Sequence, residues 1–171
     1  MREIERTGAE LPNRDDAEPA RHERGPTPMN DDELSVGVDL VDIAEVASSV
    51  KRFGDRYLRR VFTEHEISCC QGPPAVATAS LAARFAAKEA TIKVLRPHDA
   101  RPDWRSIEVV RLPSGACKLK LRGEAARLAV ERGVGPLALS MTHEGGLAAA
   151  VVVSATFSAA QPQIPEARPD S

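Results

Sequence analysis

The chain of 171 residues is 42% hydrophobic and 28% charged, and its formal net charge at pH 7 is −2. This length and composition favour one folded domain and exclude global disorder. Aromatic residues make up only 4% of the chain, which argues against a stacking surface for single-stranded nucleic acid, so no nucleic-acid partner is expected. No apolar run is long enough to cross a bilayer, so no membrane partner is expected either. Three cysteines without an apolar export signal predict reduced thiols in the cytoplasm.

Charge is distributed unevenly along the chain. Residues 1–33 hold ten acidic and five basic side chains, for a net charge of −5, and residues 158–171 have a net charge of −1. Both segments are rich in proline and lack apolar periodicity, which predicts an acidic disordered tail and a proline-rich disordered tail. The intervening residues 34–157 have a net charge of +4 and form the predicted domain. A mildly basic domain favours an anionic ligand or partner.

The first half of the predicted domain begins with a strand and continues with helices. Residues 34–41 form a nearly continuous, valine-rich apolar run, which predicts a buried strand. Residues 42–57 have helical spacing, with a break expected at Gly54. Thr63 and Glu66 have the spacing of a capping box and open a further short helix.

The second half of the domain begins with a long alanine-rich helix over residues 75–95, which must end before Pro97. A two-stranded hairpin, a helix and two further paired strands are predicted over residues 107–112, 118–121, 124–132, 137–142 and 147–157. The order of these elements predicts an α+β domain in which a small antiparallel sheet packs against the long helix.

Asp39 is the first candidate functional residue, because it lies inside the apolar run. A buried carboxylate is costly unless it is paired or binds a metal ion. On strand alternation Asp39 shares a face with Gly37, whose missing side chain would leave room for a ligand. Alternatively, Asp39 lies at the end of the strand and caps the following helix.

The long helix carries the second group of candidates. Lys88 falls in the middle of an apolar stripe formed by Leu81, Phe85, Ile92 and Leu95, and Glu89 and Lys93 flank this stripe one turn apart. Because alanines cover most of the opposite side, charges on this helix have little solvent to face. Alternatively, Lys88 extends its ammonium group to the surface, and Glu89 and Lys93 form an ordinary surface pair.

Together with Arg84 and with His143 near the end of a later strand, these residues suggest phosphate chemistry. Two carboxylates suit Mg²⁺, which takes few protein oxygens and leaves positions for water and substrate phosphates. Nearby cations suit the remaining phosphate oxygens. The pattern suggests phosphoryl-type transfer from a pyrophosphate, although a lone histidine beside a hairpin also has a structural interpretation. No P-loop and no Gly-x-Gly-x-x-Gly motif is present.

Two segments carry a family resemblance. Val36-Gly-Val-Asp39, followed by Arg84-Phe-Ala-Ala-Lys-Glu-Ala-Thr-Ile-Lys93, closely resembles the two signatures of the 4′-phosphopantetheinyl transferases. The resemblance covers roughly residues 34–156 and is strongest to the short, single-domain branch of holo-acyl-carrier-protein synthases. Supporting matches are Arg52-Phe53, Arg60-Val-Phe-Thr63-Glu-His-Glu66, Trp104 and Ser140-Met-Thr-His143-Glu.

The resemblance implies a fold, a reaction and site residues. The reaction is transfer of phosphopantetheine from coenzyme A to a serine of an acyl carrier protein, leaving adenosine 3′,5′-bisphosphate, by a homotrimer with active sites between subunits. By position, Asp39 and Glu89 would bind Mg²⁺, and Lys93 would neutralise charge on the leaving phosphate. The groups that would hold coenzyme A phosphates are Arg84, Lys88 and His143. The resemblance leaves Glu89 and a metal-bound water as candidates for the base that takes the serine proton.

Two departures from the family pattern concern partners. The family usually has a basic residue near the start of the first helix, where this chain has Glu45, and the hairpin turn often reads Gly-Lys-Pro, where this chain has Gly115-Ala-Cys117. Glu45, with Arg52 and Arg56 of the following basic segment, is predicted to face the acidic carrier protein. The alternatives to transfer are a silent carrier-binding module and a Mg²⁺-dependent hydrolase of coenzyme A.

Overall fold

The structure is a computed structural model that describes residues 34–98 and 101–156, so both predicted tails lie outside the described residues. Its strands are β1 (Leu34–Asp42), β2 (Ile107–Arg111), β3 (Cys117–Leu121), β4 (Val134–Glu144) and β5 (Leu147–Thr156). Its helices are α1 (Ile43–Phe53), α2 (Asp55–Val61), α3 (Glu64–Cys69), α4 (Pro74–Leu95) and α5 (Gly123–Glu131), with a short 3-10 helix, η1, at Trp104–Ser106. The predicted α+β class and the order of elements are confirmed.

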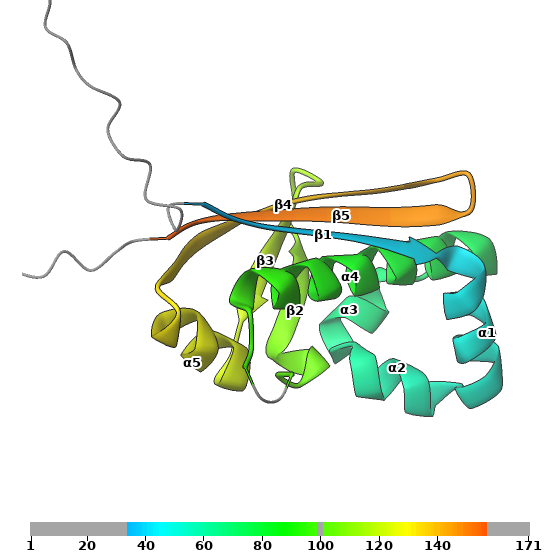
Figure 1. Cartoon of the computed structure of the whole chain (residues 1–171). Coiled ribbons are helices and arrows are strands. Elements are labelled where there is room, and N and C mark those ends of the chain that lie inside the picture. Colours follow the sequence, from blue (N-terminus) through cyan, green and yellow to red (C-terminus); the bar gives the residue numbers. More distant parts are fainter. Residues whose placement is uncertain (1–33, 99–100, 157–171) are drawn as a thin grey trace, which may run out of the picture.

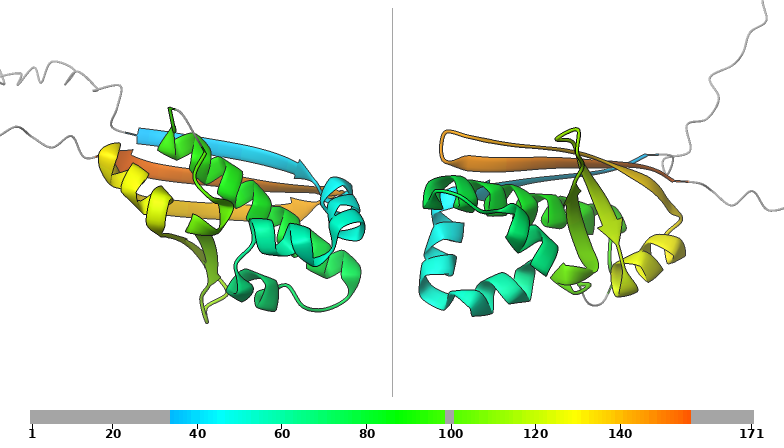
Figure 2. Two further views of the ribbon diagram at one scale, coloured as in Figure 1. Left: turned by 90° about the horizontal axis from the view of Figure 1, so that it is seen from below. Right: turned by 180° about the vertical axis from the view of Figure 1, so that it is seen from behind.

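The strands form two antiparallel sheets. In the larger sheet the strand order is β1-β5-β4, so β5 lies between β1 and β4, the strand with which β5 forms a hairpin. Strands β2 and β3 form the second sheet, a separate hairpin. Helix α4 runs along one face of the larger sheet, with the β2–β3 hairpin and the shorter helices beyond it (Figures 1 and 2). The long helix is therefore enclosed on most sides, as its scarcity of polar positions predicted.

The prediction that β1 is buried is right for one face only. Its odd-numbered residues point toward α4, but Leu34, Val36, Val38 and Leu40 on the other face are each more than half exposed. β1 is an edge strand of the larger sheet, and no described element covers this outer face. A continuous apolar run predicts burial of both faces, but a subunit of an assembly can expose one of them when it is considered alone.

Local sequence signals set the ends of the first helices. Asp42 caps α1, because its Oδ1 accepts a hydrogen bond of 2.7 Å from the amide of Ala44. Gly54 has a φ of +53°, which glycine adopts without strain, and it separates α1 from α2 as predicted. Thr63 and Glu66 form the predicted capping box at the start of α3.

The core is built around the small side chains of α4. Ala82, Ala86, Ala87 and Ala90 are fully buried, which lets the helix approach its neighbours closely. Large buried side chains on the surrounding elements complete the core, among them Phe62, Ile107, Val109 and Val152. Among the described helices, none combines the length and apolar character needed to cross a membrane.

Candidate active site

Asp39 lies on the inner face of β1 and is paired with Lys93 of α4. The Nζ of Lys93 is 2.9 Å from Asp39 Oδ1 and also donates a 2.6 Å hydrogen bond to the carbonyl of Val38. The Asp39 side chain keeps 16% of its surface exposed, so the carboxylate is screened but can be reached by a ligand. The alternative interpretation of Asp39 as a helix cap is wrong, since Asp42 caps α1.

Gly37 was expected to leave room for a ligand beside Asp39, and this expectation is wrong. A Cβ built on Gly37 would lie 2.0 Å from the carbonyl oxygen of Ala90 in α4. The space that a side chain at this position would occupy is thus filled by the backbone of α4. Glycine is required because β1 and α4 are in contact there. Its effect on the site is indirect, because this close contact brings Lys93, one turn after Glu89, within reach of Asp39.

Glu89 lies on the same helix, one turn before Lys93, and has 18% of its side chain exposed. Its two carboxylate oxygens accept hydrogen bonds of 3.1 and 3.4 Å from Nη1 of Arg101. Glu89 and Lys93 do not form the surface pair considered from spacing, because each pairs with another element. Each of the two partly exposed carboxylates is therefore paired with a cation whose side chain is at least half exposed, Asp39 with Lys93 and Glu89 with Arg101.

The described residues contain no cluster of three or more His, Cys, Asp or Glu side chains that could hold a metal ion. Asp39 and Glu89 therefore do not make a closed protein cage for a metal. A pair of hard carboxylate ligands, with other positions left for water and substrate oxygens, is nevertheless the donor set that Mg²⁺ takes in phosphoryl-transfer sites.

Lys88 lies apart from these groups, because its side chain is fully buried. Its Nζ is 2.9 Å from Glu66 Oε2, and it donates hydrogen bonds to the carbonyls of Trp104, at 2.9 Å, and Ile107. Burial lowers the pKa of Lys88 below its ordinary value, while the Glu66 carboxylate opposes this shift. With all three donor hydrogens used inside the protein, Lys88 does not fit the predicted contact with coenzyme A phosphates, and it does not extend to the surface.

Two glutamates that complete this buried network were not among the predicted site residues. Glu66 Oε1 accepts a 3.0 Å hydrogen bond from the amide of Val109, and Glu108 is bound by the hydroxyl of Thr63 and by Arg122 at 2.8 and 2.7 Å. The network joins α3, α4 and the β2–β3 hairpin through charged groups. The capping-box pattern identified Glu66 as a cap but gave no sign of its second partner.

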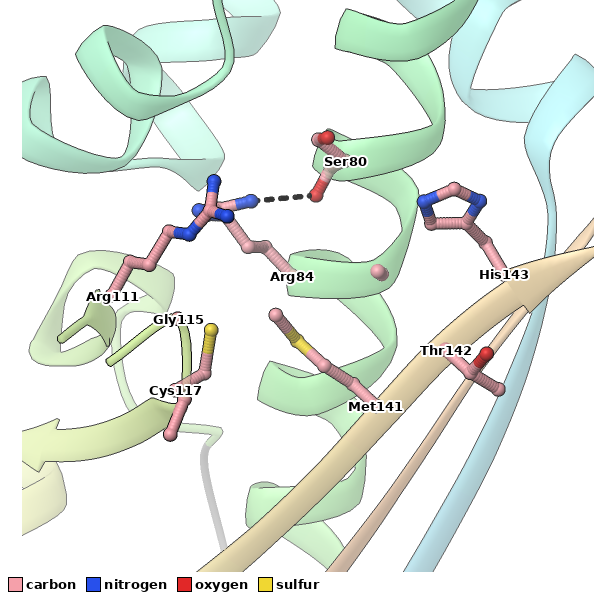
Figure 3. A pocket seen from close by; sticks show the side chains of 10 residues that line it. Ser80, Arg84, Arg111, Gly115, Cys117, Met141, Thr142 and His143 are labelled. Carbon is pink, nitrogen blue, oxygen red and sulfur yellow. Dashed lines mark hydrogen bonds between the residues drawn. The ribbon is translucent and has the colours of Figure 1, made fainter. Parts of the chain in front are cut away.

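Arg84 and His143 line a pocket of about 590 Å³ on another side of α4 (Figure 3). This volume lies within the range of small-molecule sites. Arg84 is 96% buried, since its exposed fraction is 4%, whereas His143 is exposed on β4. The structure thus brings together Arg84 and His143 in this pocket and Asp39 and Lys93 elsewhere, with Glu89 one turn before Lys93 on α4. Neither Asp39 nor Glu89 lines the pocket.

The predicted carrier-facing residues lie on the first two helices. Glu45 and Arg52 are exposed and two turns apart on α1, and Arg56 is exposed on α2. Glu45 does not form an ion pair with Arg52, whose guanidinium lies 5.0 Å from the centre of the Phe53 ring. Helix α1 begins where β1, the strand that carries Asp39, ends, and α2 follows α1 (Figure 1).

Comparison with known proteins identifies the family. Residues 35–152 match the model of the 4′-phosphopantetheinyl transferase superfamily. The chain belongs to this superfamily. A holo-[acyl-carrier-protein] synthase of Desulforudis audaxviator is 40% identical to the chain over 121 residues, which are 71% of this chain and 92% of the relative.

Solved structures of similar proteins support the same family. The ACPS–CoA complex of Chronobacterium ammoniagenes has a TM-score of 0.64 and 34% identity, and the match covers 73% of this chain and 98% of that one. The holo-[acyl-carrier-protein] synthase of Helicobacter pylori, solved in complex with coenzyme A, has a TM-score of 0.61 and 30% identity. That match covers 70% of this chain and 99% of the Helicobacter pylori protein. The predicted fold and family are therefore confirmed.

Proposed function

We propose that this chain transfers the 4′-phosphopantetheine group from coenzyme A to a serine of an apo acyl carrier protein and releases adenosine 3′,5′-bisphosphate. Its membership of the superfamily, with relatives named holo-[acyl-carrier-protein] synthase, supports the reaction class. The observation that carries the proposal to residues is the pair of Asp39 with the half-exposed ammonium group of Lys93, together with the partly exposed Glu89 one turn earlier on the same helix.

Asp39 and Glu89 would hold Mg²⁺, because both are partly exposed oxygen ligands and neither is locked into the core. When bound, the ion supplies neutralising charge for the oxygens of the pyrophosphate. Lys93 and Arg101 form the ion pairs with these two carboxylates. Their side chains are 50% and 63% exposed, so they would be able to move away when the ion binds.

The chain's own residues would then act on the pyrophosphate. In the transfer, the carrier serine Oγ bonds to the phosphorus that bears pantetheine, and the bond from that phosphorus to the oxygen of the adenosine 5′-phosphate breaks. Lys93 would balance the negative charge that collects on this leaving oxygen. Glu89 would accept the serine proton, directly or through a water molecule.

Arg84 and His143 would hold other phosphate oxygens of coenzyme A from the pocket beside α4. Lys88 is not included among these phosphate-binding residues, since its buried ion pair with Glu66 supports a structural role. Arg52 and Arg56 would meet the acidic carrier protein, and Glu45 would modulate that contact.

The exposed outer face of β1 supports the homotrimer. Four large apolar side chains on this face are each more than half exposed. Exposed apolar faces of this kind are a feature of subunit interfaces. An assembly would also explain how Asp39 and the Arg84 pocket, which are separate in one chain, serve one substrate. One subunit would contribute Asp39, and a neighbouring subunit would contribute the Arg84 pocket. Sedimentation or light scattering at micromolar concentration tests this directly, because a monomer would contradict it.

The proposed functional unit is residues 34–157, acting in the cytoplasm. The described core and every proposed site residue lie within this range. A chain cut to residues 34–157 should therefore keep its melting temperature and its activity, and a large loss of either would show that one of the removed segments contributes.

The reaction is tested by mixing the protein with coenzyme A, Mg²⁺ and an apo carrier protein and measuring the carrier mass. A gain of one phosphopantetheine group supports transfer. Products of coenzyme A cleavage without a mass gain indicate a hydrolase, and carrier binding without either change indicates a silent module. Omitting Mg²⁺ in the presence of a chelator tests the metal requirement, because transfer at an unchanged rate would contradict it.

A further inference from the structure

The pocket beside α4 contains a buried arginine that the protein itself does not satisfy. Arg84 Nη1 donates a 3.1 Å hydrogen bond to the carbonyl of Ser80, but its buried Nε has no partner. Within residues 34–98 and 101–156 it is the one buried side-chain nitrogen or oxygen without a hydrogen bond. A buried donor without an acceptor is costly, so this group is suited to an acceptor that arrives with a ligand.

A second arginine, Arg111, extends into the same pocket. It ends β2, is paired in register with Cys117 of β3, and directs its guanidinium toward Arg84 (Figure 3). Neither arginine forms an ion pair with a described acidic residue, and no aspartate or glutamate lines the pocket. Two guanidinium groups that face one another without a carboxylate repel, and an anion between them would remove that repulsion.

The hairpin turn gives a reason for the presence of Arg111. Gly115, Ala116 and Cys117 line the pocket and carry no charge. The turn therefore contributes no cation to the pocket. Arg111 reaches the same pocket from the neighbouring strand and supplies positive charge there.

We propose that Arg111 is a specificity-determining residue that acts with Arg84 to bind the phosphate monoester of coenzyme A, the group on its adenosine ribose. This inference rests on the proposed function and deepens it. Two guanidinium forks offer several donors to the three terminal oxygens of a dianionic monoester. The pyrophosphate, in which each phosphorus carries only two non-bridging oxygens, is assigned to Asp39, Glu89 and Lys93. Arg111 thus enables the enzyme to distinguish coenzyme A from its 3′-dephospho form.

The experiment compares both substrates in the full-length protein, its Arg111→Gln variant and an Arg105→Gln control. Arg105 is likewise exposed, forms no ion pair within the described residues, and does not line this pocket. For Arg111→Gln we expect the KM for coenzyme A to rise on the order of 10-fold with kcat unchanged, and the KM for 3′-dephospho-coenzyme A to stay the same. Arg111→Lys should recover part of the loss, and Arg105→Gln should match the parent protein.

Equal KM increases for both substrates in Arg111→Gln, or no increase for either, would overturn the proposal. Calorimetric binding of adenosine 3′,5′-bisphosphate and of adenosine 5′-monophosphate provides a test without turnover. The preference for the bisphosphate should fall about 10-fold in Arg111→Gln, and an unchanged preference refutes the role of Arg111. If transfer fails with every carrier while this preference is lost as expected, the proposed reaction is wrong but the phosphate site stands.

Discussion

The buried pair of Lys88 and Glu66 gives the sharpest test of the structure. In Lys88→Met the ammonium group is replaced by an apolar end of similar length, so the Glu66 carboxylate keeps its two amide donors but loses its counter-charge. The carbonyls of Trp104 and Ile107 lose a donor in the same step. Breaking a buried ion pair from one side costs about 3–5 kcal/mol. We expect the lower end of this range, because the amides of Thr63 and Val109 still bind the carboxylate.

Urea denaturation at one fixed protein concentration measures this loss, since assembly would otherwise change the apparent stability. Lys88→Met should lower the free energy of unfolding by about 3 kcal/mol, which corresponds to a fall in Tm on the order of 10 °C. Adding Glu66→Gln to the same chain should recover part of the stability, because the unpaired charge is then removed. The matched control is Lys93→Met, whose half-exposed side chain should affect stability little while activity falls sharply.

The competing role of Lys88 makes the opposite prediction. If Lys88 holds a coenzyme A phosphate, Lys88→Met should raise the KM for coenzyme A at least about 10-fold and change the free energy of unfolding by less than about 1 kcal/mol. That pair of results would refute the structural assignment and restore the role that the family resemblance implied.

Three further predictions concern the acids, the carrier surface and the thiols. Asp39→Ala and Glu89→Ala should each fold but lose at least about 100-fold in the transfer rate, and near-normal transfer by either would contradict the metal assignment. Glu45→Arg should raise kcat/KM for an acidic carrier on the order of 3- to 10-fold at low salt, with the gain vanishing near 0.5 M salt; no change at low salt for any carrier would show that Glu45 does not face it. Burial raises the pKa of the Cys70 thiol from 9.0 to about 11, so the free energy of unfolding should fall as the pH rises from 9 toward 11, where only the unfolded thiol ionises. At pH 8 iodoacetamide should modify Cys70 more slowly than Cys117, which lines the pocket and which coenzyme A should protect; equal rates would contradict the burial of Cys70.

Much of the fold was predictable because its signals are local. The break at Gly54 and the capping box of Thr63 and Glu66 depend on residues within four positions of one another, and the structure confirms both. The outer face of β1 was mispredicted because burial depends on partners outside the segment. An apolar run cannot distinguish a strand covered on both sides by its own chain from an edge strand that leaves one face exposed.

Gly37 shows a second limit. The sequence indicated correctly that β1 needs a missing side chain beside Asp39, but it could not identify what occupies the space. The carbonyl of Ala90 occupies it, from a helix more than fifty residues later in the chain. Glycine in a strand indicates close approach of some group, and only the tertiary structure distinguishes a ligand from backbone.

The three basic residues of α4 share one constraint and resolve it in three ways. Because neighbouring elements cover most of this helix, each charge must find a partner from outside it. Lys88 finds Glu66 in the core, and Lys93 finds Asp39 on β1, where solvent and a ligand can still compete. Arg84 finds only a carbonyl of its own helix, and its Nε is left without an acceptor. Helical spacing placed all three among the same candidates, but the degree to which each is paired separates them. Lys88 is fully paired in the core, Lys93 stays half exposed beside Asp39, and Arg84 keeps a buried donor without an acceptor, which is where the proposed anion would bind.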